Sequence, residues 1–142
     1  MIAIGSDHGG FKLKQKIMEH LNARGLEYKD FGTYSDESCD YPVYGKAVGH
    51  AVANGECECG IIICGTGIGI SISANKIPGV RAALCTDCFM AEATRQHNNA
   101  NILALGERVI GEGLALKIVD TFLDTPFSEG ERHIKRIAQI EG

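Results

Sequence analysis

A glycine-rich stretch that begins with a cysteine is the part of this sequence best suited to chemistry. It reads CGTGIG over residues 64–69 and follows an apolar run over residues 60–64. Three glycines at alternate positions leave backbone N–H groups free to face a negative group, and the chain behind them can form a helix whose N-terminus adds to the same positive field. We therefore expect the loop to bind a phosphate, or to stabilise an oxyanion that forms only during a reaction.

Cys64 stands at the end of the apolar run, where that positive field favours the reactive thiolate form. Most cysteines are simply small buried side chains, so a reactive role and a packing role both stay open. Gly65, Gly67 and Gly69 also resemble a dinucleotide-binding fingerprint. That fingerprint places its third glycine where this chain has Ile70, so nucleotide binding is the lesser alternative.

Two histidines stand in segments that could line the same site. His8 lies in the SDHGG turn after the first expected strand, where two glycines let a ligand approach the backbone. The alternative is that Asp7 caps the next helix and His8 is merely exposed. His97 precedes Asn98 at the end of an expected helix. It suits proton transfer beside a hydroxyl-binding amide, or it simply complements the helix dipole.

Arginines that could bind an anion lie toward the C-terminus. Arg132 and Arg136 are four residues apart on an expected helix, so they share one face. Two guanidinium groups side by side repel each other unless an anion lies between them, which favours a phosphate clamp. The alternative is that Glu129 or Glu131 neutralises the pair at the surface. Arg108, after an expected strand, is a third candidate.

The elements that must position these residues alternate along the whole chain. Short β-like runs are each followed by an amphipathic helical pattern, which is typical of a parallel sheet covered by helices on both faces. We expect a single domain over residues 1–142 with a three-layer α/β/α, Rossmann-like fold and a five-stranded parallel sheet. The expected strands span residues 2–5, 26–30, 60–64, 80–85 and 101–106.

Helix boundaries carry signals of their own. Asp87 is placed to cap a helix that runs to His97, and residues 128–131 (SEGE) have the spacing of a capping box that opens a C-terminal helix. In such a fold ligands bind at the carboxyl ends of the strands, although the pattern does not reveal strand order. The residues that follow strands, and that could line one crevice, are Asp7 and His8, residues 64–67, Thr86 and Asp87, and residues 106–108.

Composition narrows the class of function. A net charge of −4 argues against nucleic acid or a membrane surface as the main partner. There is no apolar run of about 18 residues and no basic leader, so we expect a cytoplasmic protein without a membrane span. Among the six cysteines, Cys57 with Cys59 and Cys85 with Cys88 could offer thiolates to zinc. Because no turn residues surround these pairs, reduced thiols and no metal site are the preferred interpretation.

Four motifs occur in order along the chain, followed by the arginine pair. They are GSDHGG at 5–10, CGTGIGISISANK at 64–76, HNNAN at 97–101 and LGER at 105–108, with Arg132 and Arg136 behind them. Together they closely resemble type B ribose-5-phosphate isomerase, and the resemblance spans nearly the whole chain. The wider family also holds galactose-6-phosphate and allose-6-phosphate isomerases.

The resemblance implies an enzyme that interconverts an aldose phosphate and a ketose phosphate through an enediolate, without metal or organic cofactor. Cys64 matches the base that moves a proton between carbons 2 and 1. His97 matches the residue that opens the sugar ring, with Thr66 and Asp7 nearby, and Asn98 matches one that holds substrate hydroxyls. The oxyanion hole would use N–H groups of Gly65, Thr66, Gly67, Ile68, Gly69 and Ser71. The phosphate-binding positions match His8, Arg108, Arg132 and Arg136.

The resemblance also implies a site at a dimer interface, with the segment that holds His97, Asn98 and Arg108 coming from the other subunit. We therefore expect a homodimer or a dimer of dimers. One branch of the family has a glutamate in place of Ile70 and lacks the cysteine, so this chain fits the cysteine branch. The expected substrate is ribose 5-phosphate. The alternatives are a six-carbon sugar phosphate such as allose 6-phosphate, a non-catalytic phosphosugar-binding subunit, and a nucleotide-dependent oxidoreductase.

Overall fold

A five-stranded parallel sheet lies at the centre of the computed structural model, which describes residues 1–142. The strands are β1 (Ile2–Ser6), β2 (Tyr28–Asp30), β3 (Cys59–Cys64), β4 (Ala82–Leu84) and β5 (Ile102–Gly106). Their order across the sheet is β2-β1-β3-β5-β4, and every neighbouring pair is parallel. The sheet confirms the predicted α/β class and adds the strand order that the pattern left open.

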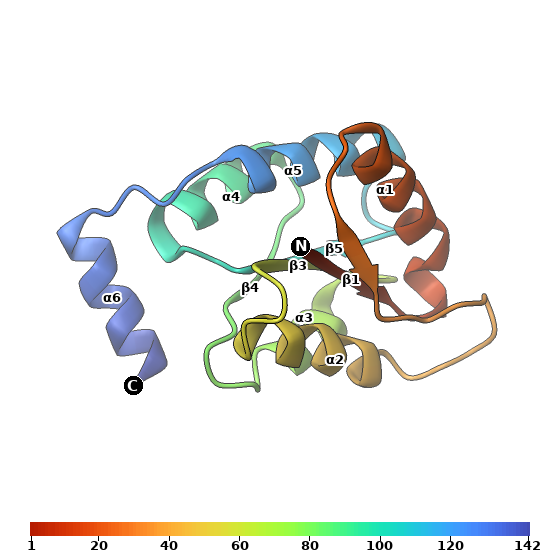
Figure 1. Cartoon of the computed structure of the whole chain (residues 1–142), viewed down its shortest axis with the longest axis horizontal. Coiled ribbons are helices and arrows are strands. Elements are labelled where there is room, and N and C mark those ends of the chain that lie inside the picture. Colours follow the sequence, from red (N-terminus) through yellow and green to blue (C-terminus); the bar gives the residue numbers. More distant parts are fainter.

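Helices cover the two faces of the sheet in separate layers, with α1, α4 and α5 on one face and α2 and α3 on the other (Figure 1). Their bounds are α1 (Phe11–Ala23), α2 (Tyr41–Ala53), α3 (Ile68–Ala74), α4 (Cys88–Ala93), α5 (Glu112–Asp124) and α6 (Glu131–Glu141), with a 3-10 helix η1 (His8–Gly10) and a π-helical turn η2 (Thr94–Asn98). Each layer packs an apolar stripe onto its own face of the sheet, which confirms the predicted three layers. None of these helices combines the length and the apolar character needed to cross a membrane.

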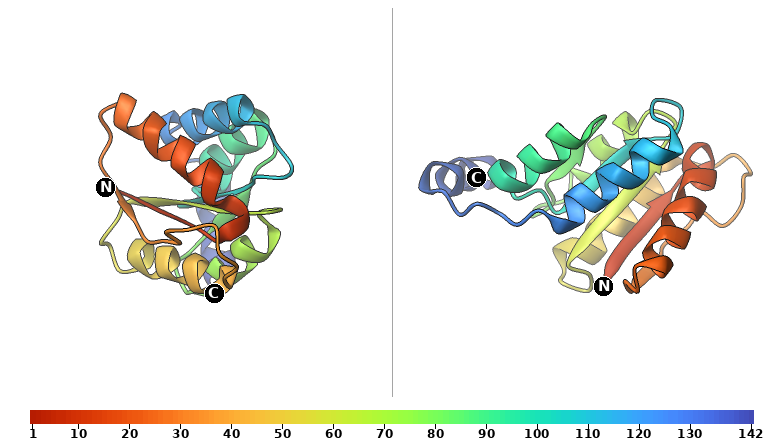
Figure 2. Two further views of the ribbon diagram at one scale, coloured as in Figure 1. Left: turned by 90° about the vertical axis from the view of Figure 1, so that its right-hand side faces the viewer. Right: turned by 90° about the horizontal axis from the view of Figure 1, so that it is seen from above.

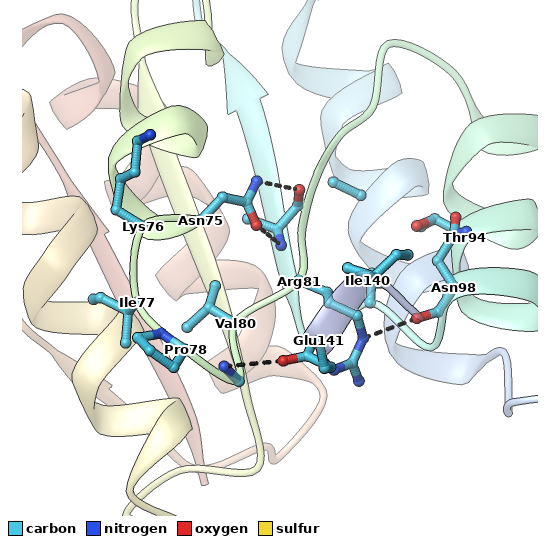
Figure 3. A pocket seen from close by; sticks show the side chains of 14 residues that line it. Asn75, Lys76, Ile77, Pro78, Val80, Arg81, Thr94, Asn98, Ile140 and Glu141 are labelled. Atoms are coloured by element: carbon cyan, nitrogen blue, oxygen red, sulfur yellow. Dashed lines mark hydrogen bonds and ion pairs between the residues drawn. The ribbon is translucent and has the colours of Figure 1, made fainter. Parts of the chain in front are cut away.

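The central strands are buried because they have helices on both sides. Ile61, Ile62 and Ile63 follow one another in β3, and all three are fully buried. β-Branched residues on both faces suit a strand in this position. At the edge strand β4, the side chain of Asn75 bonds both the N–H and the C=O of Ala82, at 2.8 and 3.0 Å (Figure 3). Asn75 thereby occupies part of an edge that would otherwise be unpaired.

The helix between β4 and β5 begins and ends as predicted. The Asp87 carboxylate accepts a hydrogen bond from the Met90 N–H at 2.7 Å, so Asp87 caps α4. α4 continues into η2, which carries His97 in its last turn. Asn99 then ends the helical segment with a left-handed backbone, at φ 45°.

α6 projects from the body of the molecule (Figures 1 and 2). The helix was predicted, but the predicted capping box over residues 128–131 is wrong. The Ser128 hydroxyl donates to the Gln96 carbonyl at 2.6 Å instead, and α6 begins without a side-chain cap. Ile134 and Ile140 remain 51% and 60% exposed. α6 therefore presents apolar side chains that its own chain does not cover.

Candidate active site

The Cys64 sulfur lies at the carboxyl end of β3, inside the glycine-rich loop. Cys64 is 5% exposed, and its Sγ accepts a hydrogen bond from the Gly67 N–H at 3.1 Å. Gly67 has a φ of +79°, and a Cβ at this position would lie 2.9 Å from the Leu105 carbonyl carbon, so glycine is required there. The Gly67 N–H thus holds the Cys64 side chain in one orientation, with the sulfur as the hydrogen-bond acceptor.

The backbone N–H groups of the loop divide into donors that are used and donors that are free. The Ile68 N–H donates to the Thr66 hydroxyl and the Ser71 N–H donates to the Gly67 carbonyl, both at 3.2 Å. The N–H groups of Gly65, Thr66 and Gly69 donate to no other group of the protein. These three are therefore available to an oxyanion. The N–H groups of Gly67, Ile68 and Ser71 already donate within the loop and α3, so their part in an oxyanion hole stays a prediction.

The turn after β1 packs directly against this loop. Asp7 is buried, and its carboxylate accepts the Gly10 N–H at 3.1 Å, so Asp7 does cap η1. A Cβ on Gly10 would lie 2.5 Å from the Ile63 carbonyl oxygen, and only glycine permits so close an approach. His8 is thereby held near the carboxyl end of β3, with its Nδ1 accepting the Cys39 N–H at 3.2 Å.

Two further side chains reach the glycine-rich loop. Arg108 donates its backbone N–H to the Gly65 carbonyl at 3.0 Å, and its Nε and Cζ lie 3.7 Å from the place of a Cβ on Gly65. The expectation that Arg108 reaches this loop from another subunit is wrong, because β5 pairs with β3 and ends beside it. Tyr41 lies with its ring against Gly69, 2.5 Å from the place of a Cβ. No periodicity or motif in the sequence points to Tyr41.

His97 and the arginine pair form a second group of predicted site residues. The His97 ring stacks on the His133 ring, with centroids 4.5 Å apart and planes inclined by 16°. Both rings and Arg132 line an open hollow of about 550 Å³ between η2 and α6. Burial, and then the neighbouring His97, Arg132 and Arg136, lower the pKa of His133 from its ordinary value. Both arginines are exposed and form no ion pair, so the surface-neutralisation alternative does not hold.

The two groups lie at opposite ends of the strands. Cys64 pairs with Gly106 at the carboxyl ends of β3 and β5. His97 and Asn98 immediately precede β5 and so lie at its amino end. Figure 1 and the right-hand view of Figure 2 show α6 at one end of the molecule, on the side of β4. A single chain therefore does not bring His97 to Cys64.

Asn98 faces a different hollow from the one that His97 lines. This hollow, of about 600 Å³, lies between residues 75–83 and the end of α6 (Figure 3). The Asn98 main-chain oxygen accepts a hydrogen bond from Arg81 at 3.0 Å, and Arg81 also pairs with Glu141 at 2.8 Å. Arg81 thus ties η2 to the end of α6, and so helps to place the helix that carries the arginine pair.

The cysteine pairs are not arranged as metal ligands. Cys57 packs on the side of α2 and α3, whereas Cys59 packs against the other face of the sheet. No three His, Cys, Asp or Glu side chains in the chain are grouped so that they could hold a metal ion. Burial raises the pKa of Cys59 to about 11 and that of Cys85 to about 12. Both thiols therefore stay protonated near neutral pH.

Known proteins match this chain over nearly its whole length. A model of the Ribose/Galactose Isomerase family matches residues 2–140. Ribose-5-phosphate isomerase B of Escherichia coli is 52% identical over 139 residues, which cover 98% of this chain and 93% of that protein. The structure of Clostridium thermocellum ribose-5-phosphate isomerase B is 58% identical with a TM-score of 0.97, covering 99% of this chain and 94% of that one. Ribose-5-phosphate isomerase B of Mycoplasma genitalium with bound ribulose-5-phosphate is 43% identical with a TM-score of 0.93, covering 99% and 93%. The chain therefore belongs to the ribose/galactose isomerase family.

Proposed function

We propose that residues 1–142 act as one cytoplasmic aldose–ketose isomerase domain that interconverts ribose 5-phosphate and ribulose 5-phosphate, without metal or organic cofactor. The observation that carries the proposal is the Cys64 sulfur, held by the Gly67 N–H at 3.1 Å beside the free N–H groups of Gly65 and Thr66. A base next to oxyanion donors is what proton transfer beside a carbonyl group requires. The similar proteins named ribose-5-phosphate isomerase B support this substrate.

In the proposed reaction the Cys64 thiolate takes the proton from carbon 2 of the open-chain aldose. The electron pair of the broken C–H bond forms the double bond of an enediolate, and the oxygen on carbon 1 takes the negative charge. The free N–H groups of Gly65 and Thr66 stabilise that charge. The proton on the neighbouring hydroxyl moves to this oxygen, and the Cys64 thiol returns its proton to carbon 1. The carbonyl group then stands at carbon 2, and the thiolate is restored.

Ring opening and phosphate binding complete the proposal. His97 of a second subunit opens the sugar ring by proton transfer, beside Asp7 and Thr66 of the first. Asn98 binds a substrate hydroxyl. Charge-assisted hydrogen bonds hold the phosphate and position the open chain over the base. The four phosphate-binding residues, taken from both subunits, are His8, Arg108, Arg132 and Arg136.

A homodimer, alone or as a dimer of dimers, is part of this proposal. Within one chain His97 lies near the amino ends of the strands and Cys64 at their carboxyl ends, so a complete site needs a second copy. The exposed Ile134 and Ile140 on the projecting α6 supply apolar surface for such an interface. A two-fold interface would bring α6 of each subunit toward the glycine-rich loop of the other, and so would form two equivalent sites.

The same chemistry on a six-carbon sugar phosphate, such as allose 6-phosphate, is the second candidate. The family model covers galactose as well as ribose isomerases, which favours keeping this candidate. A non-catalytic phosphosugar-binding subunit is a weaker candidate, because the chain keeps both the cysteine and the histidine that the isomerisation would use. These three functions differ in whether a product forms and in the length of the substrate.

Proton NMR in deuterated water, with a chelator present, tests the proposal directly. Ribose 5-phosphate should give ribulose 5-phosphate with deuterium at carbon 1, because the Cys64 proton exchanges with solvent before it returns. Turnover of allose 6-phosphate alone would keep the mechanism and change the substrate. The absence of any product from either sugar, at saturating concentration, would overturn the proposal in favour of a phosphosugar-binding subunit.

A further inference from the structure

One hydrogen bond to His8 determines the protonation of its ring. Nδ1 accepts the backbone N–H of Cys39 at 3.2 Å. A backbone N–H can only donate, so Nδ1 carries no proton and the single proton of the ring is on Nε2. This contact therefore favours the Nε2–H tautomer of His8, and no protein group accepts the Nε2–H.

We propose that Cys39 is a positioning residue whose backbone N–H holds His8 as a neutral hydrogen-bond donor, with Nε2–H free for the phosphate of the substrate. This inference rests on the proposed function, because it takes the substrate to be a sugar phosphate. His8 then adds one directed hydrogen bond without adding charge. The negative charge of the phosphate is left to the arginines, of which Arg108 lies beside the glycine-rich loop in the same chain.

The loop that carries Cys39 is held at both of its ends. At its start, the fully buried ammonium group of Lys14 donates to Asp30 at 2.6 Å and to the Thr33 carbonyl. The Thr33 N–H also donates to the Ser6 carbonyl at 2.7 Å, which ties the same segment to the end of β1. The start of the loop that carries Cys39 is therefore fixed to α1 and β1.

At the other end, the loop runs into α2 through Tyr41, whose ring lies against Gly69. His8 is fixed just as firmly, since Asp7 caps the turn that carries it and Gly10 packs on the backbone of β3. Because both partners are held, the contact between Cys39 and His8 is a property of the resting fold. It does not need a ligand to form.

The first test reads the tautomer directly. In protein with 15N-labelled histidine, at mildly alkaline pH where the ring is neutral, the His8 signals should identify Nδ1 as the unprotonated nitrogen. An Nδ1–H tautomer would overturn the inference. This measurement uses the unaltered protein, so it decides the question even if a loop variant fails to fold.

The second test removes the donor. Cys39→Pro deletes the N–H, whereas the matched control Cys39→Ala deletes only the thiol. Cys39→Pro should weaken inorganic phosphate binding and raise KM for ribose 5-phosphate about three- to tenfold with little change in kcat, as for the loss of one hydrogen bond. Cys39→Ala should stay within about twofold of the unaltered protein. Equal effects of the two variants would assign the role to the thiol and overturn the inference.

A double-mutant cycle separates positioning from general loop damage. In a His8→Ala background, Cys39→Pro should have no further effect on phosphate binding, because the ring that it positions is gone. An undiminished effect in that background would overturn the inference. If no sugar phosphate is turned over at all, the proposed function falls, while the tautomer and the inorganic phosphate titrations still decide the role of Cys39.

Discussion

The side chain of Cys64 and the backbone around it have separable roles. Cys64→Ala removes the hydrogen bond from the Gly67 N–H, but the left-handed Gly67 and its close packing against Leu105 do not involve the sulfur and should keep the loop in place. We expect kcat to fall about 10²- to 10⁴-fold, the size of a lost general base, while the sugar phosphate still binds. A steady-state assay gives kcat, and isothermal calorimetry gives the dissociation constant of ribose 5-phosphate.

Cys88→Ala is the matched control for this change. Cys88 is a half-buried free cysteine at the start of α4, outside the glycine-rich loop. Its replacement should leave kcat unchanged. If Cys64→Ala turned over substrate as fast as this control, the base would have to be another group.

His133 makes a second residue-scale prediction, which concerns stability and pH. Its pKa is lowered from 6.5 by burial and by the neighbouring His97, Arg132 and Arg136. As pH falls through 6.5 the unfolded chain therefore binds a proton that the folded chain does not, and the free energy of unfolding decreases. His133→Gln should show a smaller decrease between about pH 8 and about pH 5. Urea denaturation across that range checks this, and identical decreases in the two proteins would contradict it.

Chemistry that depends on spacing could be predicted from the sequence, and contacts between distant segments could not. Cys64 and its loop are one continuous stretch, so their geometry follows from local rules. The Cys39 N–H reaches His8 across 31 residues, and the stacking of His97 on His133 joins η2 to α6. No periodicity marks either contact, because only the packed fold brings the partners together.

Among the elements, α1 carries a lysine that fixes the loop after β2. Lys14 is fully buried, and its Nζ lies 2.6 Å from the carboxylate of Asp30. Lys14→Met keeps the apolar stem but leaves Asp30 without its cation. Because Asp30 stays partly solvated, we expect the free energy of unfolding to fall by about 2–4 kcal/mol, at or below the usual range for a broken buried pair. Chemical denaturation measures this difference.

Lys16→Met is the control within the same helix. The Lys16 side chain is 51% exposed, and its ion pair with Glu19 spans 3.8 Å at the surface. Its loss should change the free energy of unfolding by no more than about 0.5 kcal/mol. Equal losses from the two lysine variants would mean that the buried pair does not stabilise the loop.

Element type could be predicted more reliably than the way elements begin. Asp87 caps α4 as predicted because its acceptor and the Met90 N–H belong to one short segment. Ser128 has an equally good local signal, but the Gln96 carbonyl, brought close by the fold, takes its hydroxyl instead. A local capping rule holds only where no distant group competes for the same side chain.

For the molecule as a whole, connectivity decides which residues can meet. Strand alternation predicted the parallel sheet, but the order β2-β1-β3-β5-β4 had to come from the structure. Each helix that follows a strand returns the chain to the amino ends of the strands. His97, at the end of such a helix, therefore lies far from the carboxyl ends, where Cys64 is. The part of the predicted site that fails to assemble within one chain is therefore the part that follows a helix.

Subunit mixing tests whether two chains complete each other's site. Cys64→Ala and His97→Ala should each be nearly inactive as homodimers. In a mixed dimer of the proposed two-fold kind, one site carries both substitutions and the other carries neither. If equal amounts are unfolded together and refolded, about half of the dimers are mixed and each has one intact site, so about a quarter of the unaltered activity should return. Cys64→Ala refolded with the double variant Cys64→Ala/His97→Ala is the control, because neither site of that mixed dimer is intact. A mixture of the single variants no more active than this control would mean that no site combines Cys64 of one chain with His97 of the other, and the shared-site dimer would be excluded.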